Sequence, residues 1–142
     1  MLNFVGDFSI MKKLISEKTA AYGTLILLSI FVIFHLFVVA GFVPQNIVWG
    51  GRITNREELL RMEAISILIN LAIISIVAVR AGLVKVRTRS TILKVAFWLM
   101  FVLFALNTIG NLFSLNTFEK YAFTPVTFIL AVFCLRLALD KK

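Results

Sequence analysis

Four long apolar segments separated by short polar stretches constrain this chain more than any other feature. Each is close to the ~20 residues that a helix needs to cross a ~30 Å hydrocarbon core. They cover residues 20–43, 64–80, 92–113 and 121–139. A chain with 61% hydrophobic and 15% charged residues could not cover so much apolar surface as a soluble domain. Because a bilayer offers backbone amides no water, we expect an all-α, integral membrane four-helix bundle.

The N-terminal region differs from the rest of the chain. Residues 1–19 carry charged side chains and no long apolar run, which predicts a cytoplasmic tail or a short surface helix. Residues 20–142 are expected to form a single membrane domain. A secretory signal peptide is the alternative interpretation, because basic residues precede the first apolar segment and Val38-Val39-Ala40 resembles a cleavage site. The segment is longer than the apolar part of a typical signal peptide, which favours a membrane anchor.

Basic residues predict which side of the membrane each loop faces. Residues 81–94 carry Lys and Arg but no acid, and short loops of this composition stay cytoplasmic. Arg80, just before this loop, can extend its charged group to the membrane interface. The charged side chains of the loop after the third span are only Glu119 and Lys120. This distribution predicts that both termini are cytoplasmic and that the other two loops lie outside.

The second helix has a predicted start at Asn55. Its side chain can accept a hydrogen bond from an amide of the first helical turn, and Glu58 follows three residues later, as in a capping box. The acids Glu57 and Glu58 would also face the positive end of the helix dipole. The helix is therefore expected to begin before its apolar span does. Gly50-Gly51, just upstream, permits backbone angles that other residues avoid.

Charge and composition limit the partners. The formal net charge of +8 invites a nucleic-acid interpretation, but the basic residues are spread over the cytoplasmic flanks rather than gathered on one folded face. No nucleic-acid partner is expected. Anionic lipid headgroups on the cytoplasmic side are the expected counter-charge, at ~1 kcal/mol per basic residue near the surface.

The reactive side chains are few. Cys134 is the only cysteine and His35 the only histidine, so no intrachain disulfide, thiol cluster or conventional metal site is expected. The chain also lacks a phosphate-binding glycine loop and a nucleophile elbow. We therefore expect no metal, no cofactor and no catalytic residue.

Polar side chains within the spans are costly in lipid and so carry information. His35 lies ~10 Å inside the predicted outer end of its helix, and Asn70 lies at a similar depth in the next helix. Further polar residues recur at helical spacing, which places each group on one face. The groups are Glu63, Ser66 and Asn70; Asn107, Asn111 and Ser114; and Thr124 and Thr127. All of them fall in the predicted outer half of the bundle.

This asymmetry predicts a polar pocket that opens to the outside and binds a ligand. Its candidate residues within the helices are His35, Glu63, Asn70, Asn107, Asn111 and Thr124. The segment through Trp49 and Arg52 would cover it. A contact between Glu63 and His35 would form a proton-linked switch, because imidazole changes charge near neutral pH. The alternative is that these groups make ordinary packing hydrogen bonds worth ~0.6 kcal/mol each, with Glu63 paired to an arginine at the interface.

Four short motifs resemble those of small bacterial four-span membrane proteins. They are Ile47-Val48-Trp49-Gly50-Gly51-Arg52, Ser66-Ile67-Leu68-Ile69-Asn70, Asn107-Thr108-Ile109-Gly110-Asn111 and Phe123-Thr124-Pro125-Val126-Thr127. The resemblance covers most of the chain from the first span onward. It implies a multi-pass protein of the bacterial cytoplasmic membrane, but it carries no activity or site residue over to this chain.

Three functions fit the sequence. A non-enzymatic membrane protein that binds a small or lipid-like ligand, or a partner, agrees with the polar asymmetry. A small transporter or channel would need a homodimer to enclose a path, and its polar lining should continue to the inner face. An intramembrane enzyme would use Glu63 or His35 as acid or base, but the nucleophile and metal ligands are missing.

Overall fold

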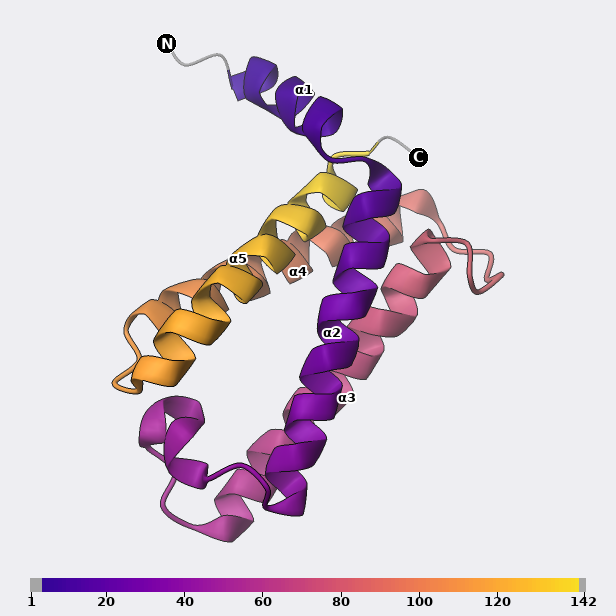
Figure 1. Cartoon of the computed structure of the whole chain (residues 1–142). Coiled ribbons are helices and arrows are strands. Elements are labelled where there is room, and N and C mark those ends of the chain that lie inside the picture. The colour runs from indigo at the N-terminus through magenta and orange to yellow at the C-terminus, as the bar shows by residue number, and fades with distance from the viewer. Residues whose placement is uncertain (1–3, 141–142) are drawn as a thin grey trace.

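The computed structural model describes residues 4–140, and its regular elements in that range are all helical (Figure 1). The long helices are α2 (Glu17–Ala40), α3 (Arg56–Arg80), α4 (Ser90–Leu112) and α5 (Thr117–Ala138). A short α1 (Phe4–Leu14) precedes them, and two turns of 3₁₀ helix, η1 (Gln45–Ile47) and η2 (Trp49–Gly51), lie between α2 and α3. With 22 to 25 residues each, α2 to α5 are long and apolar enough to cross a membrane. The predicted all-α, four-helix, multi-pass membrane architecture is confirmed.

Capping residues set the bounds of the first long helix. The side chain of Ser16 accepts a hydrogen bond from the amide of Thr19 at 3.0 Å, so α2 begins at Glu17, three residues before the predicted span. Gly41 ends it with φ of 84°, a left-handed conformation in which its amide bonds to the carbonyl of Val38. The helix therefore stops at Ala40, before the apolar sequence does.

The predicted cap of α3 is confirmed, and the structure repeats it at α5. The Oδ1 atom of Asn55 accepts from the amide of Glu58 at 2.7 Å, and that of Asn116 accepts from the amide of Glu119 at 3.1 Å. In both places an Asn is followed three residues later by a Glu. The two helices that begin at this end of the bundle thus start with the same local chemistry.

The four long helices form two hairpins. Helix α2 packs along α3, α4 packs along α5, and the hairpins meet mainly where α2 contacts α5. Figure 1 shows α2 and α5 close together near α1 and diverging toward the opposite end. Gly23 allows this contact, because a Cβ atom there would lie 2.4 Å from the ring of Phe133. Small residues such as Ala20, Ala21 and Ala138 fill the core around it.

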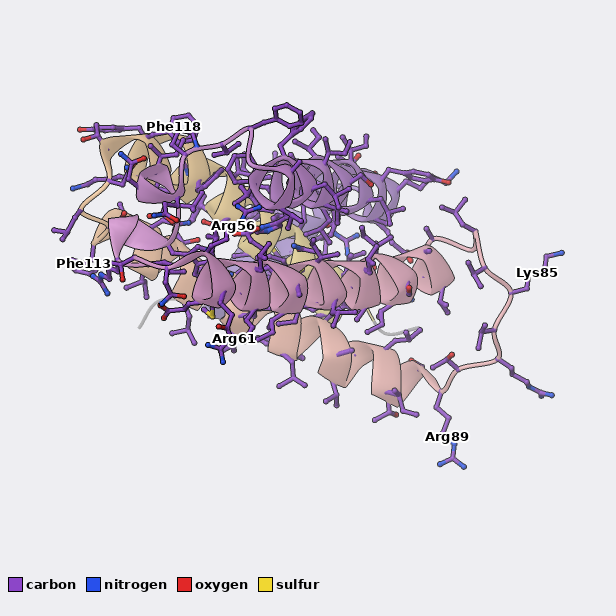
Figure 2. All side chains as sticks on the ribbon, turned by 90° about the horizontal axis from the view of Figure 1, so that it is seen from below. Arg56, Arg61, Lys85, Arg89, Phe113 and Phe118 are labelled. Atoms are coloured by element: carbon purple, nitrogen blue, oxygen red, sulfur yellow. The ribbon has the colours of Figure 1, made fainter. Side chains whose placement is uncertain are left out.

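The two ends of the bundle differ. One end of the bundle, here named the terminus end, holds α1, the end of α5 and loop 81–89 (Figure 1). Four antiparallel crossings bring these segments to the same end. The segment between α2 and α3 and the α4–α5 turn lie at the other, named the Trp49 end. In Figure 2 the basic side chains of Lys85 and Arg89 extend from loop 81–89, away from the helices. The prediction that the terminus end is cytoplasmic remains a prediction.

An ion cluster closes the terminus end. Arg80 contacts Glu17 at 3.1 Å and Asp140 at 3.2 Å, and Arg136 contacts Asp140 at 2.8 Å. The Nε atom of Arg136 also donates to the carbonyl of Ile15 at 2.7 Å. Both arginine side chains are more than nine-tenths buried. Arg80 therefore binds three helix ends together rather than extending freely to the interface.

Candidate functional site

A cavity of about 270 Å³ lies between the two hairpins. Its wall is made by side chains from all four long helices and from the segment that contains Trp49. The aromatic lining residues are Phe31, Phe34, Trp49, Phe104 and Phe123. The polar ones are His35, Glu63, Ser66, Asn70, Asn107, Asn111, Glu119 and Thr127. Most of them fall on the half of each helix nearer the Trp49 end, as the sequence predicted.

Glu63 is the centre of the polar cluster. Its side chain is only 1% exposed, and each carboxylate oxygen has a partner. Nδ1 of His35 lies 2.6 Å from Oε2 and donates to it, since a carboxylate can only accept, and the indole N–H of Trp49 donates to Oε1 at 2.7 Å. Three elements, α2, α3 and η2, are therefore joined at one buried carboxylate. The predicted contact between Glu63 and His35 is present, and in the described part of the chain Glu63 forms no ion pair with an arginine.

The segment that carries Trp49 is tightly wound. Trp49 has φ of 56°, and Gly50 and Gly51 both have φ of 68°, so three consecutive residues are left-handed. This conformation is open to glycine but costs a residue with a Cβ atom, such as Trp49, roughly 1–3 kcal/mol. At Gly51 a Cβ atom would also lie 3.0 Å from the carbonyl oxygen of Asn46. The indole of Trp49 also donates to Glu63, which ties this left-handed turn to α3.

A second buried carboxylate, Glu119, holds the same segment from the other hairpin. Its Oε2 atom accepts from the amide of Gly50 at 2.7 Å and from the hydroxyl of Ser114 at 2.6 Å. Sequence analysis placed Glu119 in an exposed loop and did not include it among the candidate residues. The repeated Asn-x-x-Glu spacing at residues 116–119 was the available signal. Trp49 and Gly50 are thus tied to α3 and to α5, across the Trp49 end.

Two asparagines face the cavity without protein partners. The side chains of Asn70 and Asn107 make no hydrogen bond with any residue in the range 4–140, although Asn70 is only 8% exposed. A buried amide without a partner costs roughly 1–3 kcal/mol in proteins, and more in hydrocarbon. Asn70 is buried in this way, whereas Asn107 is exposed on α4, a helix apolar enough to cross a membrane, where it would meet hydrocarbon rather than water.

Other polar residues of the same region serve packing. The hydroxyl of Thr108 donates to that of Thr127 at 3.0 Å, and the amide of Asn111 donates to Thr127 at 3.4 Å. These bonds join α4 to α5. The packing interpretation therefore applies to Asn111, which bonds to α5. The pocket interpretation applies to Asn70 and Asn107, which line the cavity without such a bond.

Six of the eight predicted site residues line the cavity. They are His35, Trp49, Glu63, Asn70, Asn107 and Asn111. Arg52 does not line it and is exposed, with its side chain next to Gly50. Thr124 does not line it either: its hydroxyl is buried without a hydrogen-bond partner in the described chain, and Thr127, on the next turn, lines the wall instead.

The mouth of the cavity lies at the side of the bundle. The exposed lining residues are Ile65 and Ile69 on α3 and Asn107 on α4. These two helices barely contact one another, whereas each packs closely against its hairpin partner. The cavity therefore opens between α3 and α4, within their apolar spans. The tethered Trp49 segment covers the Trp49 end of the cavity, where sequence analysis expected this segment to act as a cover.

The fold and the cavity define an integral membrane four-helix bundle with a lateral, partly polar cavity. Comparisons of the chain with models of protein families, with characterised proteins and with solved structures found no match. In the range that the structure describes, no three His, Cys, Asp or Glu residues are grouped so that they could hold a metal ion.

Proposed function

We propose that this membrane protein binds a small amphipathic molecule in the cavity between its two hairpins. The observation that carries the proposal is the pair of amides on Asn70 and Asn107, which face the cavity without protein partners. A group that costs free energy in the folded chain is explained when a ligand supplies its hydrogen bonds.

The walls of the cavity fit a molecule with one polar and one apolar end. Polar groups gather around Glu63, His35 and Asn70, while phenylalanine rings from α2, α4 and α5 cover the rest. A few directed polar groups in a mostly apolar cavity are typical of small-molecule sites. The head of the ligand would bond to the asparagines, and its tail would contact the rings.

The side opening indicates where the ligand comes from. Ile65 and Ile69 flank the mouth and would face acyl chains, because they lie on the apolar part of α3. A molecule dissolved in the bilayer could enter there without crossing water. A through-path is disfavoured, since the ion cluster around Arg80 and Arg136 and the packed core close the terminus end.

Mass spectrometry of the protein extracted with its surrounding lipid tests this proposal. We expect a small molecule to co-purify with the wild type and to be at least tenfold depleted in an Asn70→Leu/Asn107→Leu double variant. Ser75→Ala is the matched control, because Ser75 is exposed on α3 and bonds only to its own helix backbone. Equal recovery from all three proteins, or no co-purified molecule at all, would count against the proposal.

Loop 81–89 supports a second contact, with anionic lipid headgroups. Lys85 and Arg89 extend away from the bundle (Figure 2), and the apolar Leu83, Val84 and Val86 between the helices are exposed as well. Basic and apolar side chains interleaved in this way suit a charged membrane surface. Replacing Lys85, Arg87 and Arg89 by Gln should reduce co-purification of anionic over zwitterionic lipid.

A further inference from the structure

The cavity wall holds more acidic than basic side chains. Two of its lining residues, Glu63 and Glu119, are carboxylates, His35 is the only ionisable base, and no Lys or Arg is among them. When both acids are ionised they carry two negative charges, and a protonated imidazole could offset only one of them. In a low-dielectric surrounding an uncompensated charge acts strongly on a bound molecule.

Within residues 4–140, no Lys or Arg forms an ion pair with Glu63 or Glu119, and Arg52, although next to Gly50, does not line the cavity. Arg56, at the start of α3, donates instead to the backbone carbonyls of Val38 and Val39 at the end of α2. Arg61 is exposed and points away from the bundle (Figure 2). Among the described residues, the donors to the Glu119 carboxylate are neutral, namely the amide of Gly50 and the hydroxyl of Ser114.

The unpaired polar groups and the rings complete the pattern. Asn70, more than nine-tenths buried and without a partner, offers an amide oxygen as an acceptor within the same wall as Glu63. Phe31, Phe34 and Phe104 line the same cavity, and an aromatic ring attracts a cation that lies over its face at short range. Carboxylate, amide oxygen and aromatic face together are complementary to a positively charged group that also carries N–H donors.

From these contacts we infer that the ligand is a lipophilic ammonium: a protonated amine with an apolar tail. The inference rests on the proposed binding function and adds the chemical class of the ligand to it. The ammonium group would lie between Glu63 and Asn70, and its tail would extend along the rings toward the mouth between α3 and α4. An anionic or neutral molecule of the same shape should bind less well, because it cannot compensate the charge of the wall.

Three probes of equal shape and different charge test the class. They are 4-phenylbutylammonium, pentylbenzene and 5-phenylpentanoate, titrated into a Trp98→Phe variant, otherwise of wild-type sequence, in nanodiscs with a tryptophan-free scaffold and followed by tryptophan fluorescence. Trp98→Phe removes the other tryptophan, so that the signal comes from Trp49 at the cavity. We expect the ammonium to bind at least tenfold more tightly than the other two. Equal binding of all three, or preference for the carboxylate, would overturn the inference while leaving the binding function intact.

Glu63→Gln tests the residue that carries the charge. A Gln side chain keeps the volume, and its oxygen can still accept from the indole of Trp49, so we expect a folded protein that binds the ammonium at least tenfold more weakly and no longer discriminates among the probes. Glu57→Gln, on the exposed first turn of α3, should leave binding unchanged. If the Glu63→Gln variant does not fold, the comparison of the three probes on the Trp98→Phe protein still decides. Absence of all probe binding, together with equal co-purification from the asparagine variant, would refute both proposals.

Discussion

Nδ1 of His35 lies 2.6 Å from Oε2 of Glu63, although the two residues are 28 positions apart and lie on different helices. The carboxylate is almost fully buried, and its other oxygen accepts from the indole of Trp49. Glu63 therefore joins α2 to α3 through His35 and joins this hairpin to the covering segment through Trp49. Hydrogen bonds to charged groups in such surroundings stabilise proteins by roughly 1.5–3 kcal/mol.

A double-mutant cycle measures this contact. His35→Leu and Glu63→Leu should each destabilise the protein, and the double variant should lose less than the sum, with a coupling of about 1.5–3 kcal/mol, because each single change leaves a buried partner unbonded. Unfolding in detergent micelles gives the free energies. A parallel cycle of His35→Leu with Glu57→Leu should be additive, since Glu57 is exposed. Additivity in the first cycle would show that the contact contributes nothing.

The two unpaired asparagines should oppose stability. Replacing Asn70 or Asn107 by Leu removes an unsatisfied amide from an apolar wall, so the ligand-free protein should gain roughly 1 kcal/mol and melt at a higher temperature. Asn111→Leu is the matched comparison and should lose stability, because the amide of Asn111 bonds to Thr127. A loss of stability in all three variants would mean that Asn70 and Asn107 serve packing after all.

The close approach of α2 to α5 depends on Gly23. Gly23→Ala would place a Cβ atom 2.4 Å from the ring of Phe133, and the resulting displacement should cost about 1–3 kcal/mol. Gly110→Ala, with no neighbour within 4 Å of the added atom, should be neutral or should stabilise by up to about 1 kcal/mol. Thermal unfolding of the two variants distinguishes them. Similar melting temperatures would contradict the tight contact, and Phe133→Leu should rescue Gly23→Ala if the contact is the cause.

The ion cluster at the terminus end should be sensitive to its shared acid. Asp140→Asn leaves Arg136 without its carboxylate and Arg80 with Glu17 alone, so we expect a loss of about 2–4 kcal/mol. The exposed acid Glu57 provides the control, since Glu57→Gln should change stability by less than about 0.5 kcal/mol. Chemical denaturation in micelles measures both. Equal effects would indicate that the cluster adds no more than a surface charge does.

Single cysteines test the predicted orientation. In a Cys134→Ala background, Arg61→Cys should react with a membrane-impermeant maleimide added to intact cells, whereas Lys85→Cys should react only after the cells are permeabilised. Both positions are exposed in the structure and lie at opposite ends of the bundle. The reverse pattern would invert the assignment of the two faces without altering the fold.

Local chemistry made the helices predictable. The apolar runs identify α2 to α5 because a bilayer accepts only backbone whose polar groups bond within the segment. The start of α3 at Asn55 followed from a cap that acts within three residues. The end of α2 was missed by three residues, since Gly41 stops the helix while the sequence remains apolar.

The site was predictable only in part. Depth and helical spacing placed His35, Glu63 and the asparagines in one region, because polar groups within a span must find partners or a ligand. Spacing could not tell Asn111, which bonds across to α5, from Asn107, which does not, nor show that Glu119 turns inward to hold Gly50. Those outcomes depend on how the neighbouring helix is rotated.

By itself, the sequence determined that the helices are surrounded by lipid, how many spans there are and which half of the bundle is polar. Each of these is set by the free energy of transferring single side chains between water and lipid. Tertiary structure alone decided that the two hairpins diverge toward the Trp49 end, that the mouth lies between α3 and α4, and which polar groups are left without partners. Contacts between residues far apart in the chain, such as Arg80 with Asp140 and Gly23 with Phe133, fix that arrangement. They depend on the packing of whole helices, which no local pattern records.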